Sequence, residues 1–206
     1  MISIDSIRPN FINKEIFYHL KRIGFISKEL AERAGMNSYF NNLIFYASQF
    51  HDIGKIAIPD NILYKRGSLS IEEFGLIKKH TIIGEKLLEN SNDPLIEMAR
   101  IIAKFHHEKW NGEGYPFQIK GNCIPLPARI VSIADVYDSL RSKRTYKPAL
   151  SHEEAMYIII HGDKRTKPEH FDPEILNIFI KYHKNFDDIF QEFREELWIK
   201  SSTWFW

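Results

Sequence analysis

The chain has 206 residues, enough for one domain with a substantial buried core but short for two full domains. Its 28 basic and 27 acidic residues leave a formal net charge of +1, so we expect no broad basic face and no duplex nucleic acid partner. No run approaches the ~18 apolar residues of a membrane span, and the N-terminus lacks the apolar core of a signal peptide. The single Cys123 has no partner for an internal disulfide. We therefore expect a soluble, cytoplasmic protein with no membrane partner.

A first helix is predicted from the helical spacing of apolar residues between Asn13 and a stop at Gly35. Residues 1–12 would precede it as an N-terminal arm. Glu15 and His19 lie four residues apart on this helix and so share a face, from which both could reach one ion. For the pair alone, an ordinary exposed glutamate and histidine is the more common explanation.

The densest group of chemically active side chains is the motif HDIGK at residues 51–55. It closes a predicted helix that begins at Ser38, which places its polar groups at the rim of a core. His51 and Asp52 are good ligand types for a divalent metal, and Lys55 could offer a positive charge to an anion beside them. For the dipeptide alone, a capping aspartate beside a surface histidine is the more common explanation.

The region after this motif contains a break and then a clear helix start. Pro59 predicts an extended segment, because proline disfavours a continuing helix. Ser70 and Glu73 then form the pattern of a capping box, which predicts a helix that ends at His80.

The next helix is predicted to start at Asp93, before a first-turn proline, and to run into His106 and His107. Adjacent histidines on a helix point about 100° apart, so they serve two neighbouring metals more naturally than one. This spacing favours a multinuclear site. The residues from 108 to 127 contain many glycines and prolines and predict an irregular loop.

A helix predicted from Ala128 to Arg141 carries Asp135 among apolar residues, with Asp138 three residues later on nearly the same face. A buried carboxylate needs a cation, a hydrogen-bond network or solvent. Start signals at Ser151 and Asp172 predict two further helices, and no strand pattern of useful length appears. We expect an all-α fold in a single domain.

Taken in order, the motifs resemble the HD-GYP domain, a subgroup of the HD metal-dependent phosphohydrolases. The motifs that carry the resemblance are HDIGK, the downstream His80, HHEKWNGEGYP and ARIVSIADVYDSLRSKRTYK. The resemblance covers residues 13–185, which leaves 186–206 as a C-terminal helix and aromatic tail. It implies a helical HD-domain bundle with a multinuclear metal site. It also implies hydrolysis of cyclic di-GMP to pGpG, and often on to GMP, in bacterial second-messenger signalling.

Matched by position, the resemblance implies two or three divalent transition metals, with iron or manganese favoured and zinc possible. The implied ligands are Glu15, His19, His51, Asp52, His80, His106, His107 and Asp135. Asp52 would bridge the metals and Lys55 would lie near the scissile phosphate, which makes these two the candidate catalytic residues. Substrate contacts are implied at Lys55, Tyr115, Arg144 and Lys147.

Two other functions remain open at this point. One is another HD-type nucleotide phosphohydrolase, and the other is a non-catalytic regulator that binds a cyclic dinucleotide. A homodimer or a separate sensor protein is a possible partner. The sequence does not distinguish cyclic di-GMP from cyclic GMP-AMP as substrate.

Overall fold

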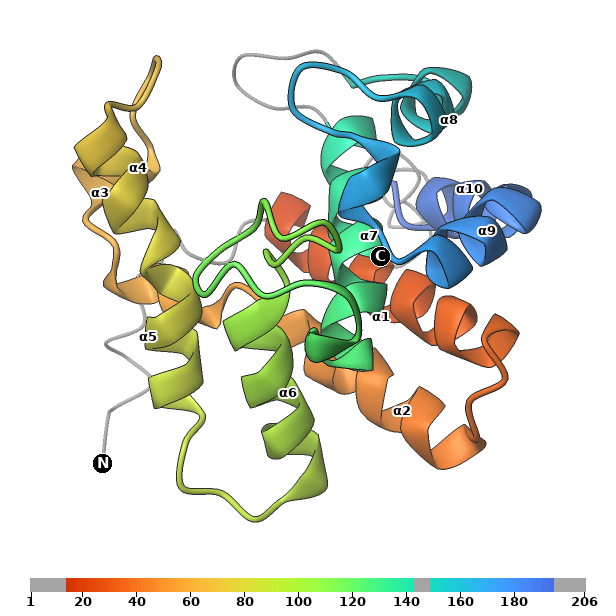
Figure 1. Ribbon diagram of the computed structural model, residues 1–206, viewed down its shortest axis with the longest axis horizontal. Helices are drawn as coiled ribbons and strands as arrows, with labels where there is room; N and C mark the ends of the chain where they lie inside the picture. Colours follow the sequence, from red (N-terminus) through yellow and green to blue (C-terminus); the bar gives the residue numbers. More distant parts are fainter. Residues whose placement is uncertain (1–13, 143–148, 195–206) are drawn as a thin grey trace, which may run out of the picture.

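The structure is a computed structural model that describes residues 14–142 and 149–194 (Figure 1). Within these residues it is all helical and has no strand, which confirms the expected fold class. The α-helices are α1 (Lys14–Arg33), α2 (Ser38–Ala47), α3 (Asp60–Leu63), α4 (Ile71–Lys78), α5 (His80–Leu87), α6 (Pro94–Phe105), α7 (Leu126–Arg141), α8 (His152–His161), α9 (Pro173–Lys181) and α10 (His183–Glu192). Short 3₁₀ helices are η2 (Ser48–Phe50), η3 (Ile53–Ala57), η4 (Gly121–Cys123) and η5 (Pro168–His170).

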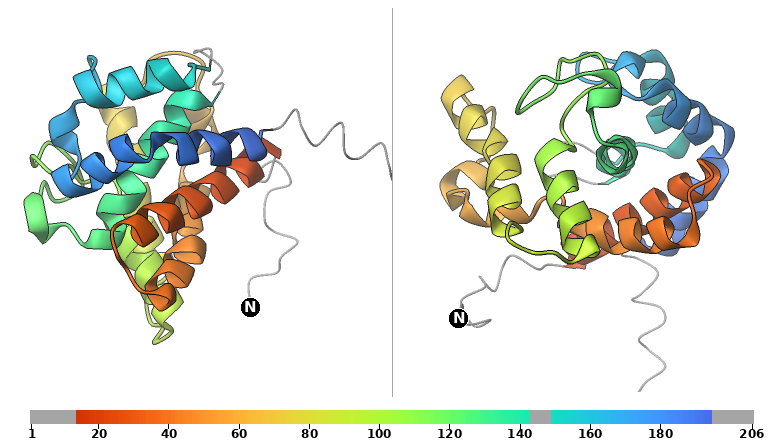
Figure 2. Two further views of the ribbon diagram at one scale, coloured as in Figure 1. Left: turned by 90° about the vertical axis from the view of Figure 1, so that its right-hand side faces the viewer. Right: turned by 60° about the horizontal axis from the view of Figure 1, so that its bottom comes forward.

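Helix α7 forms the centre of the molecule. Its sequence is apolar on most faces, which is typical of a helix that is buried all round, and Ile130, Ile133 and Tyr137 are fully buried. The right-hand view of Figure 2 looks along α7 and shows the other helices arranged around it. Helices α1 and α6 both contact α7. Any polar side chain on α7 therefore points into the interior or into a cavity within it.

The helix starts follow the predicted capping signals. Ser70 and Glu73 form a complete capping box at α4, and Ser151 and Glu154 form another at α8. The side chain of Asp93 accepts from the backbone N–H of Leu95 at the start of α6. Helix α7 begins at Leu126, two residues earlier than predicted.

Three details of the predicted elements are wrong. Helix α2 ends at Ala47, and the chain reaches the HD pair through η2. The predicted extended segment around Pro59 is limited to Ile58 and Pro59. The residues before them form η3 and those after them form α3, because the fixed φ of proline, here −59°, also suits the residue that precedes a helix. His80 starts α5 and does not close α4; Lys79 keeps a helical conformation, so the chain passes from one helix to the next without a loop.

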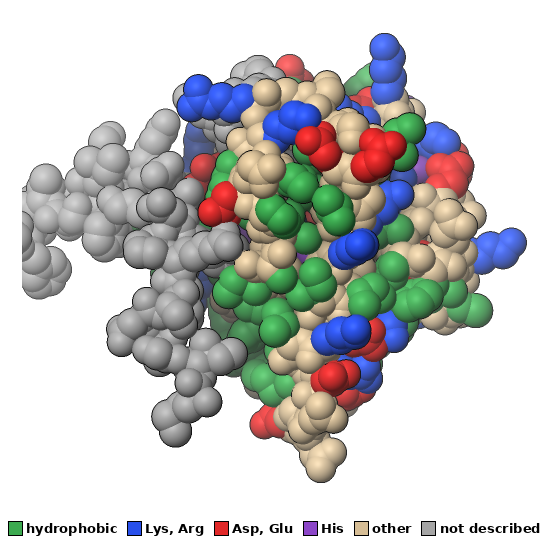
Figure 3. Space-filling model, turned by 90° about the vertical axis from the view of Figure 1, so that its left-hand side faces the viewer, with side chains coloured by type: hydrophobic (Ala, Val, Ile, Leu, Met, Phe, Trp, Pro, Cys, Tyr) green, Lys and Arg blue, Asp and Glu red, His purple; other side chains and the backbone are tan. Residues whose placement is uncertain are grey.

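Several predicted features lie outside the described residues: the arm at 1–12, Arg144, Lys147 and the aromatic end at 195–206. Among the described helices none is long and apolar enough to cross a membrane. The face that carries α3, α4 and α5 shows apolar side chains mixed with both signs of charge (Figure 3). This view shows no broad basic surface.

Candidate metal centre

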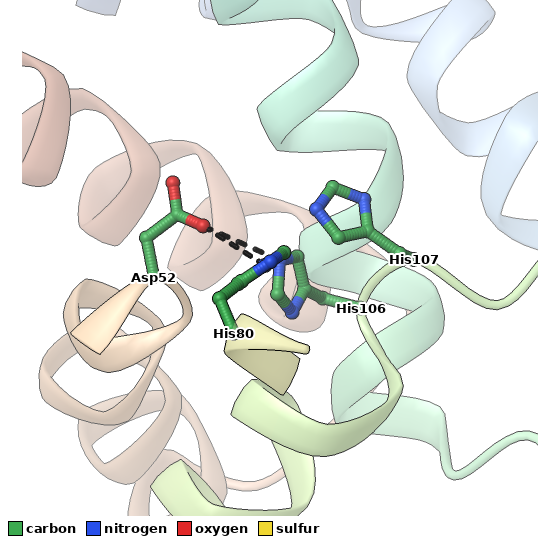
Figure 4. A group of neighbouring side chains, drawn as sticks. All are labelled: Asp52, His80, His106 and His107. Atoms are coloured by element: carbon green, nitrogen blue, oxygen red, sulfur yellow. Dashed lines mark ion pairs between the residues drawn. The ribbon is translucent and has the colours of Figure 1, made fainter. Parts of the chain in front are cut away.

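The first cluster of metal-ligand side chains comprises Asp52, His80, His106 and His107, with one ligand atom from each lying within 4.8 Å of the others (Figure 4). The residues come from separate parts of the sequence. Asp52 precedes η3, His80 opens α5, and the two adjacent histidines follow α6. Oδ1 of Asp52 lies 3.3 Å from Nε2 of His80 and 3.7 Å from Nε2 of His106.

The backbone fixes which nitrogen of these histidines carries the proton. Nδ1 of His80 lies 2.7 Å from the carbonyl oxygen of Ile77, and Nδ1 of His106 lies 3.0 Å from that of Ile102. Because a carbonyl only accepts, each Nδ1 donates and each neutral ring keeps a lone pair on Nε2. Both Nε2 atoms and Oδ1 of Asp52 are buried without a hydrogen-bond partner. Three converging acceptors with no donor fit a bound cation.

A second cluster comprises His19, His51 and Asp135. Nε2 of His51 lies 3.4 Å from Nε2 of His19, 3.3 Å from Oδ2 of Asp52 and 3.9 Å from Oδ1 of Asp135. Nδ1 of His51 is 2.9 Å from the carbonyl oxygen of Ser48, so its Nε2 is also the acceptor of the neutral ring. Asp52 thus directs one carboxylate oxygen to each cluster, which is the arrangement a bridging ligand requires.

The electrostatics of the two clusters favour a positive charge between the carboxylates. Burial lowers the pKa of His51, but attraction to Asp52 and Asp135 outweighs it and raises that pKa to about 9. Burial lowers the pKa of His80 to about 4, and burial with the neighbouring His106 holds the pKa of His107 well below its usual value. The carboxylates thus outweigh burial at His51, whereas burial outweighs them at His80 and His107, and a proton or a metal ion can neutralise the negative charge.

Asp138 contacts the second cluster through the ring nitrogen of His19 that faces away from His51. Its carboxylate is buried, accepts from Nδ1 of His19 at 2.7 Å and forms an ion pair with the equally buried Arg22. Burial raises the pKa of Asp138, but hydrogen bonds from His19 and Arg22 outweigh it and lower that pKa to about 2. The sequence indicated Asp138 through its spacing from Asp135, but Arg22 is 116 residues away and carries no local signal.

The predicted catalytic lysine lies beside Asp52, whose two oxygens face the two clusters. The ammonium group of Lys55 pairs with Asp52, and about a third of its side chain is exposed. The pairing puts its charge next to the candidate bridging carboxylate. This position results from the tight turn of η3, which places residues 52 and 55 on one side.

The predicted Tyr115 packs against the metal centre and lies outside the cavity wall. Its ring centroid is 4.7 Å from that of His107, and its backbone N–H donates to the carbonyl oxygen of His107 at 3.1 Å. A side chain at Gly114 would meet the backbone of Glu108 at 2.5 Å, so only glycine permits this close fold of the loop. The buried carboxylate of Glu108, a residue that the sequence did not single out, accepts from the backbone N–H of Phe117 at 2.7 Å.

A cavity of about 590 Å³ opens over both clusters. Asp52, His107 and Asp135 contribute to its wall, and so do Lys55 and the predicted ligand Glu15. Glu15 is exposed and belongs to neither cluster, so its predicted metal role stays a prediction. Arg144 and Lys147 fall outside the described residues, and their predicted substrate contacts stay predictions as well.

The comparisons with known proteins agree on one family. The HD domain family model matches residues 10–175. A probable cyclic di-GMP phosphodiesterase of Vibrio cholerae is 41% identical over 192 residues, which cover 86% of this chain and 43% of that protein. The cyclic di-GMP phosphodiesterase of Thermotoga maritima is 37% identical over 196 residues, which cover 95% of this chain and 52% of that protein. The chain therefore spans about half the length of these relatives.

A solved structure shares the fold. The protein Bd1817 of Bdellovibrio bacteriovorus, described as an HDG"Y"P protein, superposes with a TM-score of 0.60 at 25% sequence identity, covering 82% of this chain and 53% of that one. The family match extends over most of the sequence and includes every cluster residue described above. The chain belongs to the HD domain family, within its HD-GYP group.

Proposed function

We propose that this chain is a metal-dependent phosphodiesterase that hydrolyses cyclic di-GMP to pGpG, and then to GMP, in bacterial second-messenger signalling. The observation that carries the proposal is the convergence of partnerless, buried Nε2 and carboxylate atoms beneath a cavity. A cavity of about 590 Å³ has the size typical of sites for small organic ligands. The names of the Vibrio and Thermotoga relatives supply the choice of cyclic dinucleotide.

The donor sets would hold two divalent ions, one at each cluster, and Asp52 directs one oxygen to each set. A set rich in imidazole favours iron, manganese or zinc over magnesium. When bound, such ions supply Lewis acidity that activates water and neutralises charge on a phosphate. We propose Glu15 as a ligand for a third ion beside His19, because it lies one helical turn away on α1 and lines the same cavity.

The chain's own residues have separate tasks in this proposal. Asp52 holds the two donor sets at a fixed separation, because each of its oxygens faces a different cluster. Lys55 is positioned to stabilise the negative charge that builds on the phosphoryl oxygens as water attacks phosphorus and the 3′ oxygen leaves. The apolar wall formed by Ile53, Leu63 and Tyr64 offers a surface on which bases can pack.

The direct test is a hydrolysis assay. Protein purified without oxygen is loaded with manganese or ferrous iron and incubated with cyclic di-GMP, and the nucleotides are separated by chromatography. We expect pGpG and then GMP, and we expect Asp52→Ala to abolish both. Asp188→Ala is the matched control, because Asp188 is exposed on α10 and does not line the cavity. Full activity in the presence of a chelator would contradict the proposal.

Cyclic GMP-AMP is the competing substrate to include. A 3′3′-cGAMP-specific phosphodiesterase of Vibrio cholerae is 36% identical over 174 residues, which cover 84% of this chain and 33% of that protein. The ratio of kcat/KM for the two cyclic dinucleotides decides between them. Tight binding of either one without release of product would favour a non-catalytic regulator.

A further inference from the structure

We propose that Lys109 and Arg165 form a second anion subsite in the cavity, which holds the phosphate of the cyclic dinucleotide that is not being cut. The inference rests on the proposed function. It concerns a part of the cavity wall, around Thr166, that lies outside both metal-ligand clusters. Lys109 belongs to the motif HHEKWNGEGYP, but neither it nor Arg165 was assigned a role above.

The described cavity wall contains positively charged side chains, and some of them have no carboxylate partner. Among the described residues, the arginines and lysines that line it are Arg22, Lys55, Lys109 and Arg165. Arg22 is paired with Asp138, and Lys55 is paired with Asp52. Neither Lys109 nor Arg165 forms an ion pair with any described carboxylate. These two side chains are the positive charges of the described cavity wall that remain available to a ligand.

Lys109 is partly withdrawn from water. It lies two residues after His107, is half-buried, and has its Nζ 3.3 Å from Nε2 of His170. Glu113 attracts it, but that carboxylate already contacts Lys167 and His170, each at 3.1 Å. An ammonium group that has lost part of its hydration without gaining a carboxylate is stabilised when an anion binds beside it.

Arg165 lies on a segment whose backbone is fixed by local hydrogen bonds. Oδ1 of Asp163 accepts from the backbone N–H of Arg165 at 2.7 Å and from that of Thr166 at 2.6 Å. Gly162 begins this turn with a φ of 83°. The turn leaves the guanidinium exposed at the cavity, where its planar fork suits the oxygens of a phosphate.

The chemistry of the substrate suits a second cationic site. A cyclic dinucleotide contains two phosphodiester groups, and each carries a negative charge. One of them meets the metal ligands and Lys55 when it is cut, and the other is then free to pair with a cation elsewhere on the described cavity wall. Lys109 is close in sequence to the first cluster, and Arg165 reaches the same cavity from the segment before η5.

The experiment compares two substrates that differ in the number of phosphates. Cyclic di-GMP has two phosphodiesters, and bis(p-nitrophenyl) phosphate has one. Lys109→Gln and Arg165→Gln should each raise KM for cyclic di-GMP about tenfold, the loss expected for one charge-assisted hydrogen bond, and leave kcat within about twofold. KM for bis(p-nitrophenyl) phosphate should not change. Lys164→Gln is the matched control, because Lys164 is exposed next to Arg165 and does not line the cavity.

A binding measurement separates this proposal from the proposed function. A slowly cleaved bis-phosphorothioate analogue of cyclic di-GMP is titrated into manganese-loaded protein and followed by calorimetry. If the wild type binds the analogue and both variants bind it about tenfold more weakly, the subsite exists even when no hydrolysis is found. Equal binding by variants and wild type would overturn it, as would an equal loss of activity on both substrates. A wild type that binds no analogue would overturn both proposals.

Discussion

Asp138 determines which nitrogen of His19 can act as a ligand. Oδ2 of Asp138 lies 2.7 Å from Nδ1 of His19, and a carboxylate only accepts, so the proton of the neutral ring is on Nδ1 and the lone pair is on Nε2. That Nε2 is the atom that faces His51 at 3.4 Å. The same carboxylate is held in place by Arg22, so the orientation of the ring depends on a buried ion pair.

Replacing Asp138 by asparagine should therefore weaken both the fold and metal binding. Arg22 is buried and would lose its charged partner, so we expect the free energy of unfolding to fall by about 3–5 kcal/mol. Loss of the carboxylate behind a metal-binding histidine should reduce manganese affinity by about 10–100-fold. Urea unfolding and metal titration measure the two effects. Manganese affinity equal to that of the wild type would show that His19 is not a ligand.

Glu15→Ala tests the third ion. We expect metal content to fall by about one ion per chain and pGpG to accumulate, because a third cation would meet the extra terminal phosphate of the linear product. The first cleavage should largely survive. Glu32→Ala is the control, because Glu32 is also exposed on α1 but lies away from the cavity. If Glu15→Ala keeps the wild-type metal count and releases GMP at the wild-type rate, Glu15 is an ordinary surface residue.

Gly54→Ala should damage the metal centre through the backbone. A Cβ at Gly54 would lie 2.0 Å from the carbonyl oxygen of His80 and 2.6 Å from the backbone nitrogen of Gly84, so η3 and α5 would have to separate. We expect a loss of about 1–3 kcal/mol in stability and a lower metal content, because Asp52 and His80 lie on the two elements that would move apart.

Gly75→Ala is the control for Gly54→Ala, because here the same substitution should be tolerated. Nothing lies within 4 Å of a Cβ at Gly75, which is in the exposed helix α4. This variant should gain up to about 1 kcal/mol from helix propensity and keep its metal. Equal unfolding midpoints for the two variants in urea would show that the contact between η3 and α5 is not tight.

The His152 network should make stability depend on pH. Burial lowers the pKa of His152, which faces Tyr137, Arg141, Asp187 and His183 and lies next to Glu153. Because the folded pKa is below the unfolded value of about 6.5, the unfolded chain binds more protons in acid. Stability from this group is present above about pH 6.5 and is lost as the pH falls toward the folded pKa.

The measurement compares urea unfolding at about pH 7.5 and pH 5.5. We expect the wild type to lose more stability than His152→Gln over this interval, because the variant has no proton to take up at this position. An identical pH dependence in the two proteins would show that His152 does not contribute to it.

The sequence predicted the elements that local chemistry determines. The capping boxes at Ser70 and Ser151 are present, because both partners of each box lie within one helical turn. The two metal-ligand clusters form only when the helices pack, because residues 52, 80 and 106 are far apart in the sequence. Their common role was therefore predicted from the family resemblance and not from local patterns.

The errors arose where the sequence signal had two physical meanings. Pro59 disfavours a continuing helix but also fits the residue before a new one, and only the packing of α3 decides between them. The sequence also did not indicate which charged side chains would form ion pairs with each other. Nothing near Asp138 in the sequence indicates Arg22, and nothing near Lys109 indicates that its neighbouring carboxylate would be taken by Lys167.

The side chains of the two candidate metal-ligand clusters come from α1, the turn between η2 and η3, the start of α5, the end of α6 and the middle of α7. An unfolded chain does not hold these groups together, so an ion that binds the native protein shifts the folding equilibrium by mass action. A free ion concentration 100 times the dissociation constant would add about 2.7 kcal/mol to stability. The metal supply around the protein would thus regulate how long each molecule persists before proteolysis, as well as how fast it works.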